Sequence, residues 1–207
     1  MDEILAIYGK GGHGNVAFDT AKRMGFSEIV FYDDNNSGAD CRGNLDALLA
    51  DKLDKKISAV FVAIGNSEKR REIFRILKDN GIKTATLIDS NAVVSESAKI
   101  GEGTIVVANA TVNAFAEIGE GCIINTNSSV DHNVKIGAFS HICPGSNIAG
   151  GVSIGENSWI GIGSCAIQGV KIGDNVYLGA GSVVVAEIPS NCKAYGCPAK
   201  IAEKNVI

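Results

Sequence analysis

Two of the three histidines in this 207-residue chain, His132 and His141, lie nine residues apart among small, polar and aliphatic residues. A neutral imidazole, with an ordinary pKa of about 6.5, can accept a proton near pH 7, so His132 is a candidate general base. Asp131 precedes it and could raise its basicity, although adjacent side chains on a strand point apart. Two surface histidines without a chemical role are the alternative, and spacing alone does not decide.

A glycine-rich segment, GKGGHG at residues 9–14, is the second candidate site. It matches G-x-G-x-x-G between an apolar run and a helical pattern, and Asp33 and Asp34 end the next apolar run. Glycines let the backbone approach a diphosphate at a helix N-terminus, and a carboxylate can bind a ribose or a base. A tight strand–helix turn without a ligand is the alternative.

A third segment, AIGNSEKRR at residues 63–71, follows another apolar run. Ligands bind at the carboxyl ends of parallel strands, so Gly65 should face the glycine loop. Arg70 and Arg71 are interpreted as solvated helix residues, with a phosphate contact as the alternative.

The elements that position these residues differ between the two parts of the chain. In residues 1–87, strand-like runs alternate with helical patterns, which predicts an α/β, Rossmann-like domain with a parallel sheet. The predicted strands are residues 3–9, 28–34, 58–66 and 82–89, and the predicted helices are 15–25, 44–53 and 67–81.

Residues 88–207 follow a six-residue period. Aliphatic residues recur at every sixth position from Ile88 to Val184, and only Ala166 is smaller. A small residue usually stands four places later, with Gly or Asn nearby. This pattern predicts stacked triangular coils around an aliphatic column, in which residues 18 apart share a face and residues nine apart do not.

Composition narrows the class of protein. A formal net charge of -4 gives no reason to expect a nucleic acid or an anionic membrane as partner, and no apolar run is long enough to span a bilayer. The N-terminus is acidic, unlike a signal peptide. The six cysteines form no C-x-x-C pair, so we expect reduced thiols, no zinc or other metal, and a cytoplasmic protein.

Together these motifs, with INTNSSVDHNVKIGAFSHICPG, GIGSCAIQG and the closing GCPAK, resemble the bacterial sialic-acid-type sugar acyltransferases of the hexapeptide-repeat class. The chain is most similar in kind to N-acetyltransferases that act on UDP-linked 4-amino-4,6-dideoxy sugars, as in diacetamidobacillosamine synthesis. The resemblance covers essentially the whole chain. It implies a left-handed parallel β-helix with a C-terminal cap for residues 88–207 and a nucleotide-sugar-binding domain for residues 1–87.

The resemblance also implies roles for individual residues. It makes His132 the base that deprotonates the C4 amine of the sugar as the amine attacks the thioester of acetyl-CoA. It implies a homotrimer with active sites between subunits and no metal. The implied nucleotide-sugar contacts are Gly11, Gly12, His13, Asp33, Asp34 and Gly65, and the implied acetyl-CoA contacts are His141, Ile162 and Ala180.

One residue departs from the family pattern. The family commonly has Glu or Asp after the catalytic histidine, and this chain has Asn133, which can orient an imidazole but cannot stabilise imidazolium as a carboxylate would. Either Asp131 compensates, or the enzyme relies on a weaker base and on a substrate amine that is already largely neutral. A covalent route through Cys143 or Cys165 is disfavoured, because nothing near Cys143 in the sequence activates it. Lys200, after the turn at Pro198, could meet a phosphate of coenzyme A.

Several alternatives remain open at this point. The nucleotide could be GDP or dTDP, or the acceptor a hydroxyl, as in sialic acid O-acetylation. A non-catalytic nucleotide-sugar-binding scaffold and an NAD-dependent oxidoreductase belong to other classes. Against the oxidoreductase, the chain changes into repeats after about four strands instead of forming a second mononucleotide-binding half.

Overall fold

The structure is a computed structural model that describes residues 4–35, 38–54 and 57–204. The outer ends of the two predicted domains, residues 1–3 and 205–207, therefore lie outside the described residues. The chain divides into two compact units, Met1–Ser90 and Asn91–Ile207.

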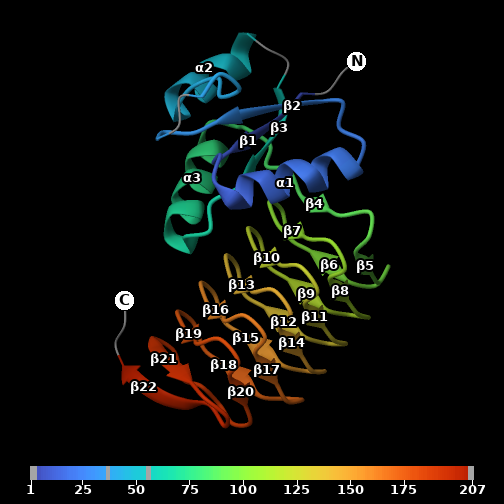
Figure 1. Ribbon diagram of the computed structural model, residues 1–207, viewed down its shortest axis with the longest axis vertical. Coiled ribbons are helices and arrows are strands. Elements are labelled where there is room, and N and C mark those ends of the chain that lie inside the picture. The colour runs from blue at the N-terminus through green and yellow to red at the C-terminus, as the bar shows by residue number, and fades with distance from the viewer. Residues whose placement is uncertain (1–3, 36–37, 55–56, 205–207) are drawn as a thin grey trace. The chain divides into compact units, whose positions relative to one another are not determined.

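The first unit alternates strands and helices, as the sequence predicts (Figure 1). β1 lies in the middle of a parallel sheet of order β2-β1-β3. Its strands are apolar runs with buried residues such as Leu5, Ile7 and Val60, as expected for a parallel sheet flanked by helices. The elements are β1 (Ile4–Tyr8), α1 (Gly12–Arg23), β2 (Glu28–Tyr32), α2 (Leu45–Asp54), β3 (Ile57–Val62), α3 (Ser67–Asp79) and β4 (Leu87–Ile88).

The fourth predicted strand, residues 82–89, is largely absent from this sheet. The backbone N–H of Val60 donates to Lys83 over 2.9 Å and that of Ala85 donates to Val60 over 2.8 Å, which makes one parallel bridge between Val60 and Thr84. The chain then continues into β4, which is not part of the β2-β1-β3 sheet.

The second unit is a parallel β-helix of two-residue strands that recur every six residues (Figure 1). We name its three faces after one strand each. The β11 face contains β5 (Val93–Val94), β8 (Thr111–Val112), β11 (Ser129–Val130), β14 (Asn147–Ile148), β17 (Cys165–Ala166) and β20 (Val183–Val184). The β12 face contains β6 (Lys99–Ile100), β9 (Glu117–Ile118), β12 (Lys135–Ile136), β15 (Ser153–Ile154) and β18 (Lys171–Ile172).

The β13 face runs on into the end of the chain. After β19 it includes β21 (Cys192–Tyr195), and β22 (Lys200–Lys204) pairs antiparallel with β21. Its earlier strands are β4, β7 (Ile105–Val106), β10 (Ile123–Ile124), β13 (His141–Ile142), β16 (Trp159–Ile160) and β19 (Tyr177–Leu178).

The aliphatic column is the core of this unit. Each inner residue pairs with the residue 18 positions on, as Ile136 does with Ile154. The column is buried from Val106 to Val184, whereas Val94 and Ile100 at its start are half-buried. Burial of one such side chain stabilises the fold by about 1.5–3 kcal/mol, so the column fixes the register of every coil.

Sharp turns at the corners explain the recurrent Asn and Gly. Every sixth residue from position 103 to position 181 has a φ between 53° and 72°, in the left-handed region that Asn and Gly tolerate best. Asn133 is one of them, with a φ of 59°. Small buried hydroxyls join successive coils, as where Ser140 Oγ donates to the Gly155 carbonyl over 2.7 Å.

Candidate functional site

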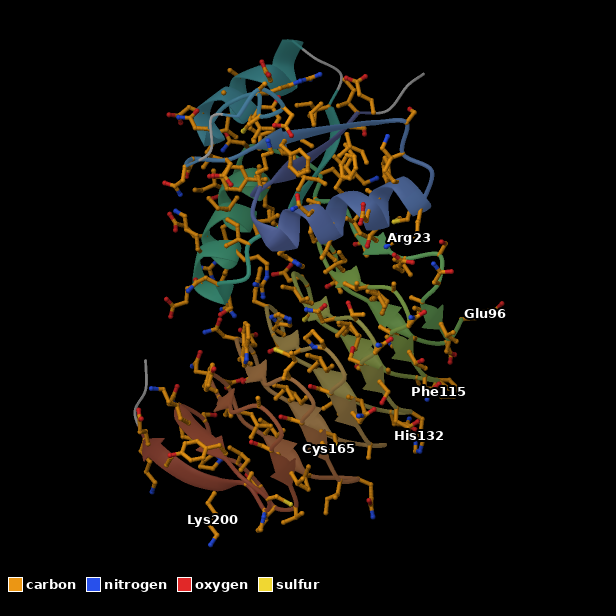
Figure 2. The ribbon with its side chains drawn as sticks, in the orientation of Figure 1. Arg23, Glu96, Phe115, His132, Cys165 and Lys200 are labelled. Carbon is orange, nitrogen blue, oxygen red and sulfur yellow. The ribbon has the colours of Figure 1, made fainter. Side chains whose placement is uncertain are left out.

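His132 lies in the turn between β11 and β12, at the corner where the β11 face meets the β12 face (Figure 2). Its side chain is exposed, and both of its backbone groups, the N–H and the carbonyl, form hydrogen bonds. The N–H donates to Asp131 Oδ1 over 2.8 Å, and the carbonyl accepts from the N–H of Gly151 over 2.9 Å. A rigid turn thus presents an accessible imidazole.

Asn133 orients that imidazole. His132 Nδ1 and Asn133 Oδ1 are 3.1 Å apart. An amide oxygen only accepts hydrogen bonds, so Nδ1 is the donor in this contact, and in the neutral ring the lone pair is then on Nε2. The contact selects the tautomer in which Nε2 can remove a proton from a substrate.

Among the described residues, the Asp131 carboxylate forms its hydrogen bonds within the turn and the neighbouring coil, and none of them goes to the imidazole. Its Oδ1 accepts from the backbone N–H of His132 and, over 3.0 Å, from Asn113 Nδ2. These two hydrogen bonds, with a smaller Coulombic contribution from His132, lower the pKa of Asp131. The sequence leaves open whether Asp131 or a weaker base compensates for the missing acidic residue; in the structure Asn133 contacts Nδ1, and Asp131 fixes the turn.

His141 lies on the β13 face, so the two histidines belong to different faces, as their nine-residue spacing predicts. It is buried, with 7% of its surface exposed, which corrects the alternative that both are surface histidines. Its Nε2 is 3.0 Å from Asn125 Nδ2, and its ring packs edge-on against Trp159 with ring centres 4.4 Å apart. His141 is held rigidly and faces outward from the aliphatic column.

Ile162 and Ala180 occupy equivalent turns one coil apart, where the β13 face meets the β11 face. Both residues are exposed, and the Ile162 carbonyl accepts from Gly181 over 2.8 Å. Among the described residues, neither Ile162 nor Ala180 donates its backbone N–H. Two stacked donors at one corner can bind carbonyl or phosphate oxygens of an extended ligand.

The β11 face separates this corner from the corner of His132. A pocket of about 480 Å³ lies along it, lined by residues of β11, β14 and β17 and bordered by Asp131. Cys165 lines the pocket and is exposed. The β11 face therefore contains the pocket, with the corner of His132 at one edge and the corner of Ile162 and Ala180 at the other.

In the first unit, the glycine loop, Asp33 and Gly65 lie at the carboxyl edge of the sheet. Gly14 and Gly9 are packing residues, since a methyl group at Gly14 would lie 2.2 Å from the Gly9 carbonyl oxygen. By contrast, a methyl group at Gly11, Gly12 or Gly65 would meet nothing within 4 Å, and none of the three has a positive φ. The chain itself does not require glycine there, and the space in front of these residues is open.

The two carboxylates at the end of β2 have different surroundings. Asp33 uses both oxygens within the chain, accepting from the backbone of Lys10 over 2.7 Å and of Asn35 over 2.8 Å. Asp34 accepts from the Leu45 N–H over 3.1 Å and, after burial itself, is the largest cause of the raised pKa of Tyr8. Both border a pocket of about 340 Å³. Through its hydrogen bond with the backbone of Lys10, Asp33 holds the glycine loop against β2.

His13 and Arg70 stand between the glycine loop and Gly65. Arg70 is 1% exposed and donates to the carbonyls of Ile64 and Gly65 over 2.8 and 2.9 Å, which corrects its interpretation as a solvated residue. Burial, assisted by the charge of Arg70, lowers the pKa of His13 to about 4. His13 Nε2 is buried and lacks a hydrogen-bond partner among the described residues.

The remaining reactive groups do not build a second centre. Burial raises the pKa of the Cys143 thiol to about 12, which makes it a poor nucleophile near pH 7. Within the described residues, no group of three or more His, Cys, Asp or Glu side chains could hold a metal ion. No helix in the same residues is long and apolar enough to cross a membrane.

Two contacts were not predicted from the sequence. Asn125 supports His141, and Gly150 lies against the ring of His132. The 18-residue stacking rule places position 150 directly after position 132 in one column of turns, so this second contact could have been found by counting. The pair of Asn125 and His141, 16 residues apart, follows from no such rule.

Comparison with known families finds two matches along the chain. Residues 4–77 match the PglD N-terminal domain, and residues 151–186 match the bacterial transferase hexapeptide (six repeats). They correspond to the parallel-sheet unit and to part of the β-helix.

Solved structures match over nearly the whole chain. The acetyltransferase domain of PglB from Neisseria gonorrhoeae is 40% identical, with a TM-score of 0.92, and the match covers 97% of this chain and 100% of that one. The same domain is also known in complex with acetyl coenzyme A, at 39% identity, a TM-score of 0.91 and coverage of 98% and 100%.

A second relative comes from Caulobacter crescentus. PerB, in complex with CoA and GDP-perosamine, is 37% identical, with a TM-score of 0.92 and coverage of 96% of this chain and 97% of that one. A variant of GDP-perosamine N-acetyltransferase from the same organism, with one histidine replaced by alanine, also binds CoA and GDP-perosamine and is 36% identical, with a TM-score of 0.92 and 97% of both chains covered.

Proposed function

This chain belongs to the hexapeptide-repeat sugar acyltransferases, as an acetyl-CoA-dependent nucleotide-sugar N-acetyltransferase, and from that premise we propose its substrate and the residues that act on it. The proposed acceptor is the C4 amine of a UDP-linked 4-amino-4,6-dideoxy sugar of the UDP-N-acetylbacillosamine type. The observation that carries the mechanism is the exposed imidazole of His132, held by Asn133 with Nε2 free.

In the proposed reaction, His132 Nε2 accepts a proton from the sugar amine as the amine nitrogen attacks the thioester carbonyl carbon of acetyl-CoA. The new C–N bond forms, the C–S bond breaks, and the imidazolium returns its proton to the departing thiolate. Backbone N–H groups would stabilise the oxyanion of the tetrahedral intermediate. Asn133 fixes the tautomer that this sequence of proton transfers requires.

The nucleotide-sugar is proposed to bind at the carboxyl edge of the parallel sheet. Open space before Gly11, Gly12 and Gly65 supports approach of the diphosphate to the backbone. His13 is proposed to turn its Nε2, unpartnered within the described part of the chain, toward the nucleotide-sugar when the ligand binds. Asp34, beside the 340 Å³ pocket, is the proposed contact to the base or ribose, and Asp33 supports the loop.

Acetyl-CoA is proposed to lie along the β-helix. The unpaired N–H groups of Ile162 and Ala180 and the outward-facing His141 support this position. Because His132 lies across the β11 face from Ile162 and Ala180, we propose that a neighbouring copy completes each site within a homotrimer. We also propose that the protein is cytoplasmic, because its cysteines are scattered and are expected to be reduced thiols.

The first experiment follows thiol release from acetyl-CoA with UDP-, GDP- and dTDP-linked 4-amino-6-deoxy sugars. We expect turnover with a UDP-linked sugar, and His132→Ala should lower kcat by about 10²–10⁴-fold with acetyl-CoA binding retained. Preference for the GDP-linked sugar would support the second candidate, which the likeness to PerB favours. If no amino sugar gives thiol release although acetyl-CoA binds, the acceptor group would be a hydroxyl instead of an amine.

The shared site is tested by mixing subunits. His132→Ala and Ala180→Trp should each be inactive alone, since one loses the base and the other blocks the cofactor corner. Co-expressed chains should regain part of the activity if one subunit supplies the base and its neighbour supplies the cofactor corner. If one chain holds both, mixed assemblies contain no intact site and stay inactive.

A further inference from the structure

We propose that Gly150 is a positioning residue, whose lack of a side chain makes room for the imidazole of His132 and holds it in line for proton transfer. This inference rests on the proposed role of His132 as the base. Gly150 lies one coil after His132, and a methyl group built on it would lie 2.5 Å from both Cε1 and Nε2 of the ring and 3.1 Å from Nδ1. The imidazole fills the volume that a side chain at position 150 would need.

The turn itself does not require glycine at this position. The equivalent residues in the adjoining coils are Ala114, His132 and Gln168, and each has a side chain. The backbone contacts repeat from coil to coil: Asn133 donates to Ala114 and Gly169 donates to Gly150, both over 3.0 Å. Gly150 does not have a positive φ, unlike Gly151 beside it at 70°. The neighbouring imidazole is therefore what excludes a side chain at position 150.

Two contacts together define the orientation of the ring. Asn133 contacts Nδ1 at one edge, and the missing side chain at Gly150 leaves room for the edge that carries Cε1 and Nε2. A methyl group at position 150 would displace the end of a flexible side chain, which costs the fold little. The displaced ring would lose its 3.1 Å contact with Asn133, and an error of about 1 Å at a catalytic group can lower the rate about 10²-fold.

The test is Gly150→Ala, read first by NMR of the histidine Cε1–H groups in the free protein. The chain contains three histidines, so His13 and His141 provide internal references for the His132 signal. We expect the His132 signal and its titration to change, while the other two signals stay in place. Gln168→Ala, at the same turn position one coil on, is the matched control and should leave the His132 signal unmoved.

Kinetics provides the second readout. Gly150→Ala should lower kcat about 10- to 100-fold, with the KM for each substrate and the Tm nearly unchanged. In a His132→Ala background the same substitution should have no further effect on kcat, because the imidazole that it would displace is absent. An unmoved His132 signal, or an equal loss of kcat in both backgrounds, would overturn the proposal. If His132→Ala retains full activity, the proposed base is wrong, while the NMR result still decides whether Gly150 positions the ring.

Discussion

At the scale of single residues, Asn133 has two tasks that select the same side chain. It occupies the left-handed position of its turn, with a φ of 59°, and its amide oxygen holds Nδ1 of His132. Asparagine is well suited to the first task, and an uncharged acceptor is sufficient to set the tautomer. A carboxylate would perform both tasks and would also stabilise the imidazolium.

Substitution of Asn133 separates orientation from charge. Asn133→Ala should lower kcat about 2- to 10-fold, because one hydrogen bond of about 0.5–1.5 kcal/mol is lost. Asn133→Asp should raise activity modestly at neutral pH, since a charge-assisted hydrogen bond to imidazolium is stronger than a neutral one. The measurement is a pair of matched pH–rate profiles, and an Asn133→Asp profile that coincides with that of the unmodified chain contradicts the second expectation.

His13 should make stability depend on pH below neutrality. Its pKa in the folded chain is about 4, below the ordinary value of about 6.5, so the unfolded chain binds more protons between these values. This contribution to stability is complete above about pH 6.5 and is lost as the pH falls toward 4. Denaturant unfolding from pH 4 to pH 7 should show a shallower slope for His13→Gln, and equal slopes would contradict the assignment.

At the scale of elements, the strand–helix turn at α1 uses its glycines for two different purposes. Gly14 permits close packing against the Gly9 carbonyl, whereas Gly12 faces open space in the same turn. Both belong to one sequence motif, so the motif by itself does not tell which glycine packs and which binds. Contacts beyond the loop decide it.

Alanine at each of these two positions should therefore act differently. Gly12→Ala should weaken binding of the nucleotide-sugar by about tenfold with no loss of Tm, because the methyl enters ligand space and alanine favours the helix. Gly14→Ala should lower stability by about 1–3 kcal/mol, because its methyl has no room. Calorimetry of binding and thermal unfolding of both variants check this pair, and a stability loss in Gly12→Ala would argue against an open site.

At the scale of the whole chain, the sequence predicts far more of the β-helix than of the parallel-sheet unit. A six-residue period is repeated so often that the inward residues, the faces and the separation of His132 from His141 follow from counting. The single bridge at Thr84 depends on a contact between distant segments, which no local pattern contains. Arg70 donates to carbonyls only five and six residues earlier, but a helical pattern does not tell that its charged side chain turns inward to reach them. The sequence also leaves the role of Asp131 open, because spacing does not tell whether its carboxylate binds the backbone, as it does in the structure, or the neighbouring ring.

The aliphatic column should account for much of the stability of the β-helix, and two neighbouring residues provide the test. Ile136→Ala removes a buried side chain from the column and should cost about 2–5 kcal/mol. Lys135→Ala, next in sequence but exposed, should change stability by less than about 1 kcal/mol, the usual worth of a surface ion pair. Denaturant unfolding compares the two, and similar losses would contradict the assigned register.

The 18-residue stacking also restricts how the length of such a chain can change. One residue inserted within a strand would shift every later aliphatic group off the column, whereas removal of a complete coil would return each later residue to the face it occupied before. Changes of length that keep the register must therefore either form loops at the corners or come as whole coils. The corner that carries His132 keeps its surroundings only under changes of these two kinds.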